Sequence, residues 1–247
     1  MMDMTLFPLL LILATILPPS ILQEDHEVKH FKDLSTTKKS VQEEIVNKHN
    51  QLRQAVIPSG SDLLKMQWNY DAQANAERWA SQCNYKHSSQ EIRNIGIKCG
   101  ENLFMSNFLA SWSYIIQDWY DESKNFNFGK GPKKPNKQVG HYTQLVWNTS
   151  HQLGCAIAEC PEEELKYFYV CHYCPPGNYI RRQYVPYTRG EPCALCPDDC
   201  EDNLCTNRCN HEDKYSNCLN LKKSLTCKHP TVKKDCKATC NCQGKIH

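Results

Sequence analysis

Sixteen cysteines are the most reactive side chains of this 247-residue chain, and two chemistries are open to them. The segments CHYC, ending at Cys174, and CALC, ending at Cys196, have the C-x-x-C spacing of a zinc site or redox centre in a cytosolic protein. The count is even, however, with six cysteines between Cys83 and Cys174 and ten between Cys193 and Cys242. In an exported protein such a set predicts disulfides.

The N-terminal segment indicates export. Residues 6–17 (LFPLLLILATIL) are apolar, Pro18 and Pro19 end the run, and charged residues follow. The run is too short to span a bilayer and is typical of a signal peptide, although Asp3 precedes it without any Lys or Arg. We therefore expect residues 1–22 to be a signal peptide and the mature protein to be secreted, without a transmembrane segment. All the cysteines would then form disulfides, which leaves no thiolate for catalysis.

The apolar pattern that follows predicts helices first and adjacent strands afterwards. Asp71 is a plausible N-cap of the second helix. Gly and Pro mark residues 129–136 as a loop, and the polar residues 23–40 are expected to be a flexible lead-in. This order indicates an α+β domain with a mostly antiparallel sheet. The predicted helices are 41–56, 71–83 and 111–122, and the predicted strands are 153–160 and 166–174.

The composition changes near Cys193. An acidic, disulfide-linked hinge is expected at residues 188–208, and a crosslinked module at 209–242 is too small to fold on an apolar core alone. The 29 Lys and Arg nearly balance the 27 Asp and Glu, which suggests no nucleic-acid partner. The C-terminal lysines are either ordinary solvated surface or a basic face that meets an acidic one, such as a channel mouth. They are Lys214, Lys222, Lys223, Lys228, Lys233, Lys234, Lys237 and Lys245.

Two local motifs bear on modification and catalysis. Asn148-Thr149-Ser150 is the one N-glycosylation sequon, and it predicts a glycan at Asn148 if this residue faces outward. The alternative is an unmodified Asn that caps a turn. No G-x-S-x-G nucleophile motif is present, and we predict no catalytic residue and no enzyme activity.

Four segments together resemble one family. They are HNQLR (49–53), CGENLF (99–104), GHYTQLVWNTS (140–150) and YVCHYCPPGNY (169–179). They resemble the CAP superfamily, and the ten C-terminal cysteines resemble its cysteine-rich secretory proteins of the mammalian epididymal, testicular or salivary kind. The resemblance implies an α-β-α sandwich CAP domain at residues 41–187, followed by the hinge and a toxin-like tail. It also implies the disulfides Cys83–Cys160, Cys99–Cys174, Cys155–Cys171, Cys193–Cys200, Cys196–Cys205, Cys209–Cys242, Cys218–Cys236 and Cys227–Cys240.

The resemblance also implies a cleft with two histidines and two glutamates. Matched motif by motif, these are His87, Glu101, Glu122 and His141. Two imidazoles could ligate Zn²⁺ weakly, with the carboxylates completing the shell. The alternatives are a hydrogen-bonded cluster that stabilises the sandwich, which is compatible with metal binding, and an acid–base pair for hydrolysis.

The tail spacing resembles a sea-anemone potassium-channel toxin module. In such a module Lys233 and Lys234 would lie in an exposed loop between Cys227 and Cys236, although no aromatic residue follows Lys233 as it does in the toxins. The resemblance implies a secreted protein that binds cell surfaces and modulates cation channels, in sperm maturation, fertilisation or glandular secretion. Its partners would be sperm or egg surface proteins and cation channels, and storage in secretory vesicles is compatible with this. The alternatives are a metal-assisted hydrolase or protease and a defence protein that binds sterols or microbes.

Overall fold

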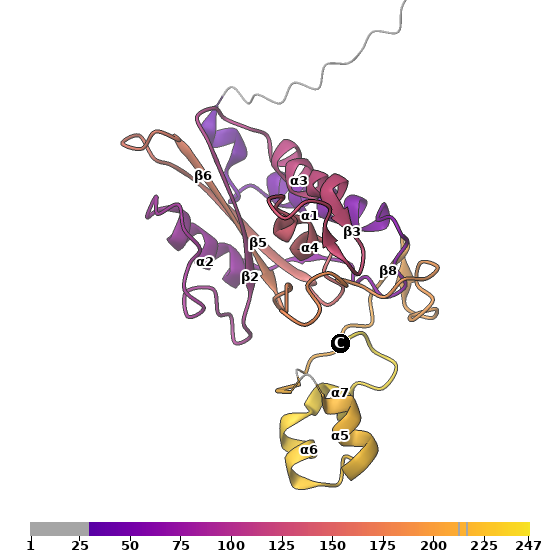
Figure 1. Ribbon diagram of the computed structural model, residues 1–247. Helices are drawn as coiled ribbons and strands as arrows, with labels where there is room; N and C mark the ends of the chain where they lie inside the picture. The colour runs from indigo at the N-terminus through magenta and orange to yellow at the C-terminus, as the bar shows by residue number, and fades with distance from the viewer. Residues whose placement is uncertain (1–29, 212, 216) are drawn as a thin grey trace, which may run out of the picture.

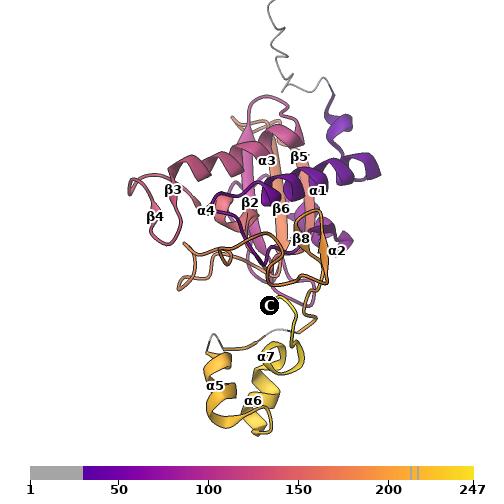
Figure 2. The same ribbon diagram turned by 90° about the vertical axis from the view of Figure 1, so that its right-hand side faces the viewer.

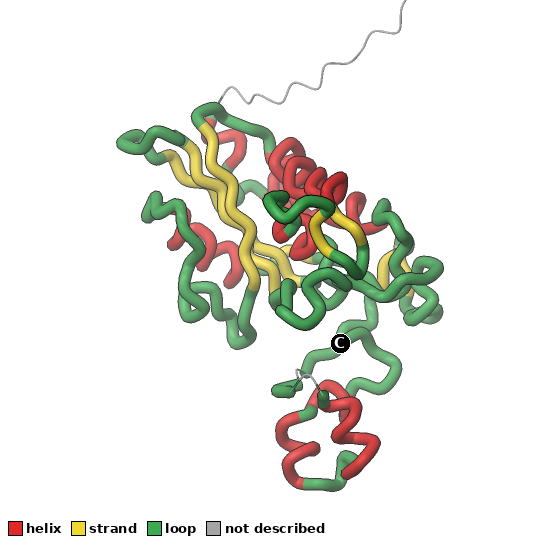
Figure 3. Tube along the Cα trace, in the orientation of Figure 1, coloured by secondary structure: helices red, strands yellow, loops and turns green. Residues whose placement is uncertain are grey.

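A four-stranded sheet forms the centre of the larger domain (Figures 1 and 3). The computed structural model describes residues 30–211, 213–215 and 217–247, so the expected signal peptide lies outside the described residues. The strand order is β1-β5-β6-β2, with β6 antiparallel to both neighbours and β1 parallel to β5. The bounds are β1 Gln67–Trp68, β2 Gly100–Ser106, β5 Gln152–Glu159 and β6 Tyr167–Cys174.

Helices cover both faces of this sheet, which confirms the α-β-α sandwich. Figure 1 shows α2 on one side and α1, α3 and α4 on the other. Alternation along β6 explains the two cores, because successive side chains point to opposite faces. Phe168 and Val170 pack with α2, whereas Tyr169 and Tyr173 pack with α1, α3 and α4. The helices are α1 Lys39–Gln54, α2 Tyr70–Ala80, α3 Trp112–Asp121 and α4 Gly140–Leu145.

The predicted helices and strands are confirmed to within a few residues, but one predicted cap was wrong and two elements that carry site residues were not predicted. Asn69, not Asp71, caps α2, because its side chain accepts a hydrogen bond from the Ala72 amide. Strand β2 was missed, since half of its short sequence is polar. The short helix α4 was also missed.

The expectation of a flexible lead-in is wrong for residues 31–40. Residues Phe31–Leu34 form a 3-10 helix (η1), and α1 begins at Lys39. Leu34 is buried, and its carbonyl accepts a hydrogen bond from the Trp112 indole. The burial of Leu34 and the bond to its carbonyl thus hold this stretch against α3.

The remaining elements are short. Residues 129–136 form the expected loop apart from the two residues of β4. The elements are η2 Glu122–Asn125, β3 Phe126–Asn127, β4 Gly131–Pro132, β7 Cys200–Glu201, β8 Leu204–Cys205, α5 Cys218–Leu225, α6 Pro230–Asp235 and α7 Lys237–Asn241. None of the helices in the described part of the chain is long and apolar enough to cross a membrane.

The hinge packs on the sandwich, whereas the tail, residues 209–247, forms a separate lobe (Figure 1). Leu204 of the hinge is fully buried in the main core, and the Cys205 amide donates to the Leu63 carbonyl. The end of the chain returns to the hinge, where the Ile246 amide donates to the Asn207 carbonyl. The structure contains the eight disulfides that the resemblance implied, and none joins the tail to the sandwich.

Arg53 ties α1 to two distant loops. Its guanidinium is fully buried and donates five hydrogen bonds of 2.8–3.2 Å to main-chain carbonyls. Burial lowers the pKa of Arg53 to about 9, so the group stays charged at neutral pH. The acceptors are the carbonyl oxygens of Leu64, Leu145, Trp147 and Asn148.

We expect Arg53→Lys to lower the free energy of unfolding by about 3 kcal/mol, because an ammonium cannot reach all four buried carbonyls and leaves some unpaired. Denaturant unfolding with the disulfides intact measures the change. Arg181→Lys, in an exposed loop, is the control. Equal stability of the two variants would contradict this role for Arg53.

Candidate functional site

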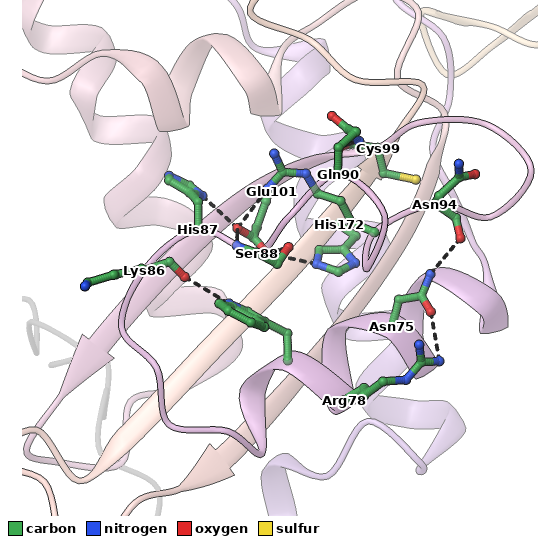
Figure 4. A network of polar contacts seen from close by, with 12 residues as sticks. Asn75, Arg78, Lys86, His87, Ser88, Gln90, Asn94, Cys99, Glu101 and His172 are labelled. Atoms are coloured by element: carbon green, nitrogen blue, oxygen red, sulfur yellow. Dashed lines mark hydrogen bonds and ion pairs between the residues drawn. The ribbon is translucent and has the colours of Figure 1, made fainter.

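A buried carboxylate, Glu101 on β2, is the centre of a polar network (Figure 4). Its Oε1 accepts from His87 Nδ1 at 2.7 Å, the Ser88 amide at 2.9 Å and Arg93 Nη1 at 3.1 Å. Its Oε2 accepts from Ser88 Oγ at 2.7 Å and from His172 Nε2 at 3.0 Å. A carboxylate offers about four lone-pair sites, so these five donors saturate it.

The electrostatics of the network favour an ionised Glu101 beside a neutral His172. Burial alone would raise the pKa of Glu101, but hydrogen bonds from His172, His87 and Ser88 outweigh it and hold this pKa well below its usual range. Burial lowers the pKa of His172 and outweighs the opposite effect of Glu101. A neutral His172 that donates through Nε2 carries a lone pair on Nδ1, and within the described residues this buried Nδ1 has no hydrogen-bond partner. A carboxylate with so low a pKa is a poor general base near neutral pH.

A second pair joins the end of α3 to α4. Glu122 Oε1 lies 2.8 Å from His141 Nδ1, and its Oε2 accepts from the amides of His141 and Tyr142 at 2.9 and 3.0 Å. Glu122 thus satisfies free amides in the first turn of α4, where no side chain of the cap residue does so. The His141 ring stacks on Trp119 with centroids 6.2 Å apart.

The four residues of the expected metal site therefore form two pairs. The two pairs are linked through β2, because Asn102, the residue after Glu101, donates to the His141 carbonyl at 3.1 Å. Within residues 30–211, 213–215 and 217–247, one group of three His, Cys, Asp or Glu has ligand atoms within 4.8 Å of one another. It consists of Cys193, Cys196 and Cys205, whose sulfurs are all in disulfides.

Each histidine of the pairs keeps one nitrogen for other partners. Both rings bond a carboxylate through Nδ1, and the His87 side chain is 61% exposed. A histidine that ligates a metal commonly donates its other nitrogen to a carboxylate in this way. The geometry thus leaves the Nε2 atom of each ring outside the pairs, with Glu101 and Glu122 bound to the Nδ1 atoms.

Sequence reasoning missed three partners of Glu101: Ser88, Arg93 and His172. His172 stands in CHYC between two disulfide cysteines, and only its register opposite Glu101 shows its role. The sequence interpretation also left out HEVKH (26–30), which has the H-E-x-x-H spacing of zinc hydrolases. That motif needs both histidines on one helix, and the backbone of His30 is extended (φ −134°, ψ 129°). Residues 26–29 lie outside the described residues.

Asn148 does not face outward, so the condition for the predicted glycan is not met. Asn148 is 3% exposed, its Nδ2 donates to Asp62 Oδ2 at 2.8 Å, and its Oδ1 accepts from Arg182 at 3.1 Å. The nitrogen that a glycan would occupy is thus buried and bonded. Of the two interpretations, an unmodified structural Asn agrees with the geometry.

The tail lysines also differ from expectation. Lys233 and Lys234 are exposed but lie on helix α6, not in a loop. Pro230 occupies the first turn of this helix, a position that its fixed φ favours. The helix holds both lysines in defined directions on the outside of the tail.

A buried hydrogen-bond chain lies beside the two pairs. His49 Nδ1 donates to the Ile45 carbonyl at 2.8 Å, and its Nε2 lies 2.9 Å from the Tyr173 hydroxyl. Asn102 donates to the same hydroxyl at 3.3 Å. Burial lowers the pKa of His49 to about 4 and raises that of Tyr173, so both groups are neutral at pH 7.

Comparison with known proteins agrees with the fold and the cysteine pattern. A family model described as "Cysteine-rich secretory protein family" matches residues 46–173, and one described as "Crisp" matches residues 193–247. Cysteine-rich secretory protein 1 of Mus musculus is 62% identical over 244 residues, which cover 99% of this chain and 100% of the relative.

Two more distant proteins extend the comparison. The cysteine-rich venom protein helothermine of Heloderma horridum horridum is 48% identical over 245 residues, which cover 98% of this chain and 100% of the relative. The crystal structure of NaASP2 with Zn²⁺ has a TM-score of 0.57 at 27% identity, with 68% of this chain and 96% of that chain covered.

Acid should destabilise the protein through its buried histidines. Unfolded histidine binds a proton near pH 6.5, whereas burial lowers the pKa of both His49 and His151 to about 4. Their contribution is therefore complete above pH 6.5 and is lost as the pH falls towards 4. We expect the free energy of unfolding to be lower at pH 5 than at pH 7.5 by about 2 kcal/mol for each histidine.

Denaturant unfolding at the two pH values, with the disulfides intact, measures this loss. His49→Gln should remove about half of it, and the exposed His211→Gln is the control. An identical pH dependence in His49→Gln and the unmodified protein would rule out His49 as a source.

Proposed function

Since the chain belongs to the cysteine-rich secretory protein family, we propose that it binds cell surfaces and modulates cation channels, in sperm maturation, fertilisation or glandular secretion. Its family and its eight disulfides make it an extracellular protein. Channel modulation is assigned to the tail, and cell-surface docking to the CAP domain. The Mus musculus relative supports a mammalian role, and helothermine, named as a venom protein, supports action outside the secreting cell.

The tail carries the proposal, because it is a small rigid scaffold with a basic surface. Helices α5, α6 and α7 pack around the fully buried Val232, and three disulfides close the unit. Among its lysines, Lys214 pairs with Asp235 at 3.7 Å and Lys222 donates to the Thr239 carbonyl. Six others are exposed and have no carboxylate within 4 Å in the described part of the chain: Lys223, Lys228, Lys233, Lys234, Lys237 and Lys245.

Such a surface suits the outer mouth of a cation channel, where acidic groups concentrate cations. Crosslinks hold the lysines in place before binding, so less conformational entropy is lost on contact. Apolar side chains accompany them, since Leu219 is 63% exposed and Leu225 is 44% exposed on α5. Basic and apolar groups on one preorganised unit support a protein target.

We expect Lys233→Glu with Lys234→Glu to weaken channel modulation about tenfold or more, because four units of charge are reversed on α6 without loss of a crosslink. Current recordings on a cation channel, with the mature protein applied from outside, measure the effect, which should also decrease at high salt. Lys133→Glu with Lys134→Glu, an adjacent exposed pair in the CAP domain, is the matched control. An unaltered response of the α6 variant would contradict channel modulation by the tail.

We also propose that His87 and His141 bind Zn²⁺ weakly through Nε2. The support is the carboxylate on Nδ1 of each ring, together with the Zn²⁺ in the crystal structure of NaASP2. Two imidazoles without a third gathered ligand account for low affinity. Zinc here would link the loop that carries His87 to helix α4, which carries His141.

Calorimetric titration with Zn²⁺ tests this site. We expect His87→Ala with His141→Ala to abolish the binding heat, because the variant lacks both imidazole ligands. His211→Ala with His229→Ala, both exposed in the tail, is the control. Unchanged titration of the first variant would show that these histidines are not the ligands.

We further propose that the protein is not an enzyme. Glu101 is saturated by donors and has a lowered pKa, which argues against a metal-assisted hydrolase or protease at this site. The described residues contain no free thiol.

A further inference from the structure

Two long segments of the CAP domain lack acidic residues. No Asp or Glu occurs between Glu122 and Glu159, or between Glu164 and Glu191. Within these segments, residues 128–138 and 178–190 hold four lysines and three arginines, and we call them the basic loop pair. The cations are Lys130, Lys133, Lys134, Lys137, Arg181, Arg182 and Arg189.

The fold brings the two loops side by side. Figure 2 shows the β3–β4 hairpin projecting from the sandwich with the orange 178–190 loop next to it. The Gly129 amide donates to the Tyr184 carbonyl at 2.7 Å, and Asn178 Nδ2 donates to the Gly140 carbonyl at 2.9 Å. Arg189 lies 4.3 Å above the ring centre of Phe128. The loops are thus joined along their length and form one surface.

This surface carries uncompensated charge. Six of the seven cations face solvent, and in the described part of the chain no carboxylate lies within 4 Å of any of the seven charged groups. Arg182 is the exception, because its guanidinium donates to the buried Asn148 and lies 5.0 Å from the ring centre of Trp147. Two acidic residues at the end of α3 are engaged elsewhere, since Asp121 pairs with Lys124 at 2.6 Å and Glu122 with His141. Hence no ion pair in the described part of the chain neutralises the basic loop pair.

Apolar side chains project from the same surface. Ile180 is 88% exposed, Tyr179 is 54% exposed and Val185 is 41% exposed. Ile180 stands next to Arg181 in the chain, so an aliphatic group lies directly beside the cations. An exposed isoleucine side chain adds no hydrophobic stabilisation to the fold. A partner with an apolar layer would bury it.

We propose that the basic loop pair binds the surface of a bilayer that contains anionic phospholipid. The phosphate and carboxylate headgroups would meet the six cations other than Arg182, and Ile180, Tyr179 and Val185 would enter the boundary between headgroups and acyl chains. A sulfated polysaccharide would satisfy the charges but offers no apolar layer for Ile180. The inference rests on the proposed cell-surface docking and names its target, and it does not depend on the channel activity of the tail.

Sedimentation of the mature protein with phosphatidylcholine vesicles, with and without phosphatidylserine, tests the proposal. We expect binding only with phosphatidylserine. Lys133→Glu with Lys134→Glu should reduce partitioning about tenfold or more. The matched control is Lys233→Glu with Lys234→Glu, which makes the same charge change in the tail.

A second variant separates apolar insertion from charge. Ile180→Ser should weaken vesicle binding about tenfold, because an aliphatic side chain no longer leaves water. Ile57→Ser is its control, since Ile57 is 89% exposed and lies outside the loop pair. Equal losses in each variant and its control would overturn the proposal.

Heparin binding distinguishes the alternative partner. Retention on heparin without any binding to phosphatidylserine vesicles would replace the lipid by a sulfated polysaccharide. Vesicle binding without channel modulation would leave this inference standing and refute the tail mechanism. Channel modulation without vesicle binding would do the reverse.

Discussion

The buried guanidinium of Arg53 is the interaction on which the sandwich depends most. It reaches the carbonyls of Leu64 and of residues 145–148, two loops that no regular ladder could pair. A buried cation is costly unless its donors are satisfied, and here all the contacts are to main-chain oxygen. The first of these loops contacts Cys205 of the hinge, and the second directly follows α4. The positions of Cys205 and of His141 therefore both depend on Arg53.

The sheet supplies the second constraint. Strand β6 is buried on both faces, and its alternation sends Tyr173 to one helical layer and His172 to the other. Each belongs to a separate polar chain, one ending at His49 and one at Glu101. The polar groups of both chains are buried, and most of them are hydrogen-bonded. They therefore fix the register of β6 and the orientation of the histidines. Glu101 belongs to one of these chains and also bonds His87, so it links the stability of the sheet to the orientation of that ring.

Charge is arranged on this scaffold at two separate places. The basic loop pair lies on the sandwich, and the exposed lysines of the tail lie on a lobe held by its own disulfides. Each place combines cations with exposed aliphatic side chains, so neither resembles a merely solvating surface. A net charge of +2 conceals both, since acidic residues gather in the hinge and other segments.

The sequence by itself determined the helices α1 to α3, the strands β5 and β6, and the grouping of cysteines into a sandwich set and a tail set. Periodicity and cysteine count are local properties, and they need no knowledge of distant contacts. The tertiary structure alone decided that His172 and Arg93 complete the shell of Glu101, and that Glu101 and Glu122 each hold a different histidine. It also decided that Asn148 is buried and that Lys233 stands on a helix. These outcomes depend on which segments meet across the sheet and on how crosslinks orient a short stretch, and no local pattern encodes either.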